Sequence, residues 1–182
     1  MEQTNFSEEE PKREPLVATL VISPAAQDFF NQLRQQHFPP ERNYLRAHLT
    51  LFHALPDEPW IVEDLEKLAQ HQPQFGATAL HLVSLGFGTA FKIVSPELPA
   101  LHQELQKRWA QYLTSQDKQK RNFHITVQNK VEPAAAKKLL AELSDNFEPF
   151  SFAVTGISLW RYKGGPWEFI TTVPFLGSTL IS

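Results

Sequence analysis

The stretch RAHLTLFHALP, residues 46–56, alternates apolar and polar side chains in the way that is typical of a β-strand. Leu49 and Leu51 occupy one face of this strand. His48, Thr50 and Phe52 are expected together on the other face, because side chains alternate along a strand. A face that merely met water would more often carry lysine, glutamate or glutamine. The pattern therefore indicates a function for this face.

A second stretch, FHITVQNKV at residues 123–131, repeats the pattern with His124 and Thr126. One His-x-Thr triplet is weak evidence in a chain of this size. Two copies, each with apolar residues at the second and fourth positions, arise by chance at roughly 0.3%. We therefore take His48, Thr50, His124 and Thr126 as candidate catalytic residues.

The residue types suit one kind of chemistry. Two such strands side by side would place two imidazoles and two hydroxyls around one small cavity. Imidazole titrates near neutral pH, so one ring can accept a proton while the other donates one. The hydroxyls can donate hydrogen bonds to phosphoryl oxygens in the transition state. The alternatives are incidental polar residues that face solvent, or a zinc site, for which threonine is a poor ligand.

Composition narrows the class of protein. The chain has 182 residues, 42% of them apolar, and a formal net charge of −3, so no global field draws it to nucleic acid. It has no cysteine, which excludes a disulfide framework and a thiol nucleophile. The polar N-terminus lacks the apolar core of a signal peptide, and no run approaches the roughly 20 apolar residues of a membrane span. We expect a cytoplasmic monomer with no membrane contact.

Hydrophobic periodicity predicts the order of the secondary structure. The predicted strands lie at 16–23, 48–55, 77–88, 89–95, 123–131, 150–162 and 168–175, and the predicted helices at 25–38, 59–72, 96–115 and 133–147. Adjacent strand pairs predict antiparallel sheet and hence the α+β class. The similar content of the two halves predicts an internal duplication packed as one domain over 15–176. Poorly ordered tails are expected at 1–14 and 177–182.

The paired HLTLF and HITVQ strands resemble the motifs of the two-histidine phosphoesterase superfamily and its 2′-5′ RNA ligase and cyclic phosphodiesterase family. The resemblance covers residues 15–176. It implies two pseudo-symmetric lobes of antiparallel sheet flanked by helices, with the active-site cleft between them. It also implies a proton-transfer pair in His48 and His124, phosphate ligands in Thr50 and Thr126, and neither a metal nor another cofactor.

The same resemblance implies a substrate class. Members cleave or form 2′-5′ linkages or open 2′,3′-cyclic phosphates, so the expected partner is an RNA end or a small nucleotide. The RNA-ligase branch often carries an arginine shortly after the second motif. Here the sequence reads Gln128-Asn129-Lys130, which leaves open the branch, the direction of the reaction and the natural substrate. Which histidine is the acid and which the base is also left open.

Basic and aromatic residues near the motifs are candidate substrate-binding residues. They are Phe52, Lys130, Arg46, Arg121, Trp160 and Tyr162. The basic residues could form a positive rim for a polyanion, and the aromatic residues could stack on a base. The alternatives are solvated loops and core packing. His53 is expected on the face opposite His48, in a structural role.

Two other functions fit the same residues. A non-catalytic module could hold an RNA end or nucleotide in the cleft without turning it over. An esterase could act on a phosphodiester that carries no base. Loss of turnover on replacing either motif histidine would separate an enzyme from a binding module. A lack of base preference, together with tolerance to loss of the candidate stacking aromatic residues, would favour the esterase that needs no base.

Overall fold

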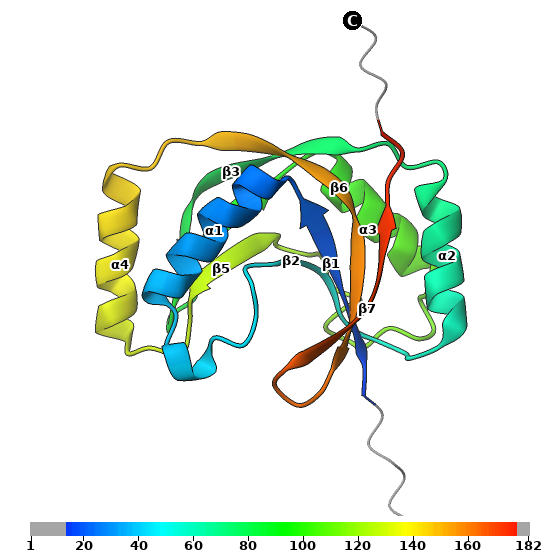
Figure 1. The fold of residues 1–182 in the computed structure, drawn as a ribbon, viewed down its shortest axis with the longest axis horizontal. Helices are drawn as coiled ribbons and strands as arrows, with labels where there is room; N and C mark the ends of the chain where they lie inside the picture. The colour runs from blue at the N-terminus through cyan, green and yellow to red at the C-terminus, as the bar shows by residue number, and fades with distance from the viewer. Residues whose placement is uncertain (1–13, 178–182) are drawn as a thin grey trace, which may run out of the picture.

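The structure is a computed structural model that describes residues 14–177 (Figure 1). Its strands are β1 (Leu16–Ile22), β2 (Leu49–Leu55), β3 (Phe75–Ser84), β4 (Thr89–Val94), β5 (His124–Gln128), β6 (Phe150–Tyr162) and β7 (Trp167–Pro174). Its helices are α1 (Pro24–His37), α2 (Pro59–Ala69), α3 (Glu97–Arg108), α4 (Pro133–Asp145) and the short 3-10 helix η1 (Pro40–Arg42). This order is the predicted one. The predicted tails lie outside the described residues, except for Glu14 and Gly177.

Local sequence signals explain most element boundaries. Helices α1, α2 and α4 each begin with a proline, whose fixed φ suits the first helical position. The β3–β4 and β6–β7 hairpins turn at Gly86 and Gly164, which have φ values of 79° and 84°. Helix α3 ends seven residues before the predicted 115, because Trp109 leaves the helical conformation and buries its ring beside Phe52.

The seven strands form one antiparallel sheet in the order β1-β2-β5-β4-β3-β6-β7. Strand β6 also pairs with β1, so the first six strands close into a ring and β7 extends from β6. The two halves of the chain each supply a β-α-β-α-β unit, β1 to β3 and β4 to β6. The third strand of each unit pairs with the other unit, since β3 joins β4 and β6 joins β1.

Two lobes result, and they are not the two halves of the sequence (Figure 1). We call them the β2 lobe (β1, β2, the second part of β6, β7, α2 and α3) and the β5 lobe (β3, β4, β5, the first part of β6, α1 and α4). Helix α1 packs on β5 and α4 on β3 and β4, whereas α2 packs on β7. Beneath α3, Trp109 meets Phe52; beneath α1, Phe30 meets Phe91 and Phe152. The predicted α+β class with two lobes is confirmed.

None of the helices within residues 14–177 has the length and apolar character needed to cross a membrane.

Candidate active site

The two motif strands meet at one antiparallel residue pair, Leu49 with Ile125. Both of these side chains are fully buried in the core. Extending the register by one residue in each direction places Thr50 opposite His124 and His48 opposite Thr126. These four side chains share the face opposite the core, and all four are half-buried. The junction therefore makes a square in which each histidine faces the threonine of the other strand.

Both motif histidines are held in the same way. His48 Nδ1 lies 2.8 Å from the carbonyl oxygen of Arg46, and His124 Nδ1 lies 2.9 Å from that of Asn122. A carbonyl can only accept, so Nδ1 donates its proton in both rings. In the neutral imidazole Nε2 is then unprotonated, and it is the nitrogen that can exchange a proton with a ligand. The two rings have the same tautomer because each contacts the carbonyl two residues before it.

Burial favours the neutral form of both rings. It lowers the pKa of His48 to about 4, against the raising effect of the Arg46 carbonyl, and Coulomb interactions with Arg34, His124 and His53 lower it further. Burial also lowers the pKa of His124, opposed by the Asn122 carbonyl. Both histidines are therefore neutral in the free protein at pH 7.

Positive charge adds to the effect of burial on His124. Arg121, His53 and Lys92 each lower its pKa. Strand β4 places Lys92 directly beside His124 across the sheet, so the two side chains share a face. In the β2 lobe Thr19 pairs with Thr50 and Leu20 with Leu49, so the register puts the apolar Val21 beside His48, where Lys92 stands beside His124. Lys92 was not a sequence candidate; its only signal was its place on the second strand of a predicted hairpin.

A cavity of about 370 Å³ opens beside His48. Its walls carry the aromatic residues Tyr44, Trp160, Trp167 and Phe169. The Trp167 ring lies 4.7 Å from the His48 ring, centroid to centroid, and Trp160 donates its indole N–H to Thr19 Oγ1 at 2.9 Å. Of the four motif residues, only His48 lines this cavity. Trp160 was a sequence candidate; Trp167 and Phe169 were missed, although they alternate on β7 just after the hairpin.

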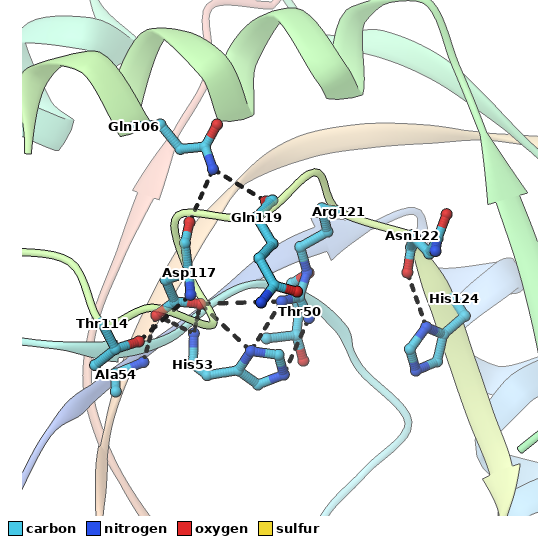
Figure 2. A network of polar contacts seen from close by, with 10 residues as sticks. All are labelled: Thr50, His53, Ala54, Gln106, Thr114, Asp117, Gln119, Arg121, Asn122 and His124. Atoms are coloured by element: carbon cyan, nitrogen blue, oxygen red, sulfur yellow. Dashed lines mark hydrogen bonds and ion pairs between the residues drawn. The ribbon is translucent and has the colours of Figure 1, made fainter. Parts of the chain in front are cut away.

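A polar network lies behind the junction on the β2 side (Figure 2). Asp117 is buried and accepts hydrogen bonds from the backbone amides of His53 and Ala54 at 2.8–3.0 Å. Burial favours its neutral form, but the contact with the His53 side chain and these backbone hydrogen bonds hold the pKa of Asp117 below its usual value. Arg121 donates Nε to the carbonyl of Thr50 at 3.0 Å, and its guanidinium nitrogens lie 2.8 and 3.1 Å from the His53 ring nitrogens.

The expected faces of Phe52 and His53 were wrong. Thr50 pairs with Thr19 but Phe52 pairs with Ala18, so Leu51 is an extra residue in β2. Such a bulge reverses which side chains point to the core. Phe52 is consequently fully buried, stacked on a core histidine, and is not a substrate contact. His53 turns toward the motif face, where it interacts electrostatically with both motif histidines.

The expected place of Lys130 was also wrong. Strand β5 ends at Gln128, and Lys130 is an exposed turn residue with a φ of 60°. It therefore does not continue the motif face. Arg46 is exposed at the rim of the cavity, and Arg121 is mostly buried beside Thr50. Tyr162 is exposed at the end of β6 and does not line the cavity, so its contact with a substrate stays a prediction.

Arg34 is a further residue at the junction, and no sequence pattern singles it out. It lies on α1 and is 5% exposed. Its Nη1 donates to the carbonyl of Thr126 at 3.1 Å, and burial lowers its pKa to about 10. Only the packing of α1 on β5 brings it to the junction. Within residues 14–177, no three histidine, aspartate or glutamate side chains gather as a metal-binding group.

Comparison with known proteins shows which protein family and which solved structures this chain resembles. A family model described as the 2′-5′ RNA ligase superfamily matches residues 22–166. Among solved structures, E. coli LigT complexed with 3′-AMP aligns with a TM-score of 0.61 at 19% identity, and a phosphoesterase aligns with 0.58 at 18%. TT0787 of Thermus thermophilus aligns with 0.59 at 13% identity. Each alignment covers 90% of this chain and 99% of the other. A search of curated protein sequences finds no match.

Proposed function

Because this chain belongs to the 2′-5′ RNA ligase superfamily, we propose that it is a metal-independent phosphoesterase acting on a 2′,3′-cyclic or 2′-5′ phosphodiester. The observation that carries the proposal is the junction at Leu49 and Ile125, which sets two His-x-Thr pairs against each other. The substrate is an RNA end or a small nucleotide. The two motif histidines transfer protons, and the two motif threonines donate hydrogen bonds to the non-bridging phosphoryl oxygens.

The reaction is a displacement at phosphorus. In hydrolysis of a 2′,3′-cyclic phosphate, a water oxygen bonds to phosphorus and one ribose oxygen leaves. The neutral histidine takes the proton of the water at Nε2, and the protonated histidine gives one to the leaving oxygen. Ligation replaces water with a ribose hydroxyl. The same four side chains serve hydrolysis and ligation, since both reactions are displacements at the same phosphorus.

Substrate binding itself raises the proton affinity of one motif histidine. Both histidines are neutral in the free protein because burial lowers their pKa values. An acid–base pair needs one of them charged. A phosphodiester between them carries a negative charge, which favours the imidazolium form and raises the pKa of the ring that faces the leaving oxygen. Binding thus creates the protonation state that the reaction requires.

The aromatic cavity supports a base-bearing substrate. Trp167 and Trp160 present ring faces and edges beside His48, and stacking on such rings tolerates any base. Arg46 at the rim adds a positive charge for a phosphate chain. E. coli LigT structures were determined with the nucleotides 3′-AMP, ATP and NADP+, and also with phosphate and in apo form. The proposed substrate places its base in this cavity and its phosphodiester at the junction.

The test is hydrolysis of nucleoside 2′,3′-cyclic monophosphates with EDTA present. We expect wild-type turnover to survive EDTA and to fall about 10²–10⁴-fold in His48→Ala and in His124→Ala. His71→Ala, which replaces an exposed histidine just after α2, is the matched control and should keep full activity. Turnover that persists in both motif variants would overturn the proposal.

Two other results would favour a different function. A wild type that binds the nucleotide without turnover, with affinity kept in both alanine variants, would mean a binding module. Equal turnover of every cyclic nucleotide, kept when Trp160 or Trp167 is replaced by alanine, would favour an esterase without base recognition. If simple cyclic nucleotides are inert, 2′-5′-linked RNA is the next substrate to examine.

A further inference from the structure

Two arginines contact the motif strands in corresponding ways. Arg34 donates Nη1 to the carbonyl of Thr126 at 3.1 Å, and Arg121 donates Nε to the carbonyl of Thr50 at 3.0 Å. Across the junction, Thr126 faces His48 and Thr50 faces His124. Each arginine therefore serves one cross-strand pair of threonine and histidine. The contacts correspond although one arginine comes from a helix and the other from the segment before β5.

The charge of Arg34 has no negative partner nearby. Its Nε donates to Asn43 Oδ1 at 2.8 Å and to the carbonyl of Leu45 at 3.0 Å, and its guanidinium lies 3.9 Å from the centre of the Phe38 ring. All of these partners are neutral. Among residues 14–177, no carboxylate lies within 4.0 Å of its guanidinium. Burying an unpaired cation is costly, so a purely structural residue here would more cheaply be neutral.

Arg121 differs in this respect. Asp117, whose side chain is fully buried, lies 4.0 Å from its Nη1. The same carboxylate lies 3.4 Å from the Nδ1 of His53. One negative charge is therefore built in behind the Thr50–His124 pair. Behind the Thr126–His48 pair, the described residues supply none. The two arginines hold equivalent backbone groups, but only one leaves a net positive charge at the junction.

We infer that Arg34 and Arg121 are positioning residues of the proposed phosphoesterase: each holds the carbonyl of one motif threonine behind the histidine that faces it. The uncompensated charge of Arg34 attracts the anionic phosphate to the junction and adds to the effect of burial on His48, which faces Thr126. The inference rests on the proposed function only in taking a phosphate as the anion.

The charged groups around each motif histidine determine which titrations must be measured. Those acting on His48 are Arg34 of α1, His53 of β2 and His124 of β5. Those acting on His124 are Arg121, His53 and Lys92 of β4. Each arginine thus acts on one motif histidine, while His53 acts on both. A change in one arginine should move the titration of its own histidine more than that of the other.

The sharpest variant is Asn43→Asp, which puts a carboxylate where an amide oxygen already accepts from Arg34. It neutralises the cation while keeping its hydrogen bonds. We expect the His48 imidazole titration, followed by NMR, to rise by roughly one pH unit, with His124 unmoved. The dissociation constant for inorganic phosphate, the probe used, should rise roughly five- to tenfold. Asn146→Asp, which adds the same charge at an exposed residue after α4, is the control.

The partner experiment is Arg121→Gln, which should raise the His124 titration by more than that of His48, on which Arg121 acts only through His124 and His53. Arg121→Lys keeps the charge and should restore the wild-type titration. Lys138→Gln, which removes an exposed cation on α4, is the control for loss of one positive charge and should move neither histidine. Thermal melts identify any variant that fails to fold. Asn43→Asp retains Arg34 itself, so it decides the question if replacements of the buried arginines do not fold.

The outcomes separate this inference from the proposed function. Titration and phosphate binding need no turnover, so they can be read even if no tested ester is hydrolysed. The inference is supported if each change shifts mainly the titration of the histidine that its arginine acts on. Unmoved titrations in Asn43→Asp and Arg121→Gln would overturn it, as would equal shifts of both histidines in either variant. Unchanged phosphate affinity in Asn43→Asp would overturn the role of the Arg34 charge.

Discussion

The two sides of the junction carry the same reactive groups in different surroundings. On the β2 side, His48 opens onto an aromatic cavity and Trp167 lies 4.7 Å away. On the β5 side, His124 has Lys92 beside it on the next strand. Both histidines donate Nδ1 to the carbonyl two residues before them. The two His-x-Thr motifs therefore share one arrangement of proton-transfer groups and differ in what surrounds it.

The largest expected effect tests the part that is shared. His48→Ala and His124→Ala should each lower kcat about 10²–10⁴-fold, because each removes one proton-transfer group. The double variant should lose little more than the worse single variant, since the two groups act in one step. Steady-state hydrolysis of a cyclic nucleotide measures all three. If the double loss equals the product of the single losses, the two histidines act independently and the shared mechanism is wrong.

The next effect concerns the threonines. Thr50→Val and Thr126→Val remove a hydroxyl at nearly constant volume, and each should lower kcat about 10²-fold with a smaller change in KM. Thr→Ser at either position keeps the hydroxyl and should keep most of the activity. A valine variant that raises KM alone would place that hydroxyl in substrate binding rather than in transition-state stabilisation.

A smaller effect on KM should distinguish the surroundings of His48 from those of His124. Trp167→Ala should raise KM for cyclic nucleotides about five- to 100-fold with kcat little changed, because stacking on one base is lost. Lys92→Met should raise KM by a similar factor for every base, and should also weaken the dependence of KM on salt. The measurement is KM for purine and pyrimidine substrates at two ionic strengths. Matching changes in the two variants would remove the proposed asymmetry.

The smallest effect concerns pH. The pKa of His48 is about 4, and that of His124 is below its ordinary value of 6.5. The reaction needs one neutral and one charged histidine, and the free protein holds that state between the two pKa values. Accordingly kcat/KM should fall up to about tenfold per pH unit as pH rises above 6.5. A rate that instead rises from about pH 6.5 to about pH 8 would contradict the lowered pKa values.

The sequence predicted the elements well because its local signals were strong. Hydrophobic periodicity, prolines at helix starts and glycines in hairpins are short-range features, and they predicted the order of all strands and of helices α1 to α4. Helix α3 was predicted too long, since the burial of Trp109 against Phe52 depends on a residue far along the chain. Lobe membership could not be predicted, because β3 and β6 each pair with the other half.

The candidate site likewise contains residues that local sequence signals could predict and residues that they could not. Two copies of His-x-Thr identified His48, Thr50, His124 and Thr126, because the period of a strand alone puts each pair on one face. His53 was misplaced because an extra residue at Leu51 reversed the faces of β2, which single-sequence alternation cannot reveal.

The sequence by itself determined the α+β class, the order of elements and the four motif residues, since each follows from periodicity within a short segment. The tertiary structure alone decided that Thr50 faces His124, that Arg34 reaches Thr126, and that an aromatic cavity opens beside His48. These contacts join segments far apart in the chain. They depend on how β2 and β5 pair and on how α1 packs, and no local pattern encodes such long-range packing.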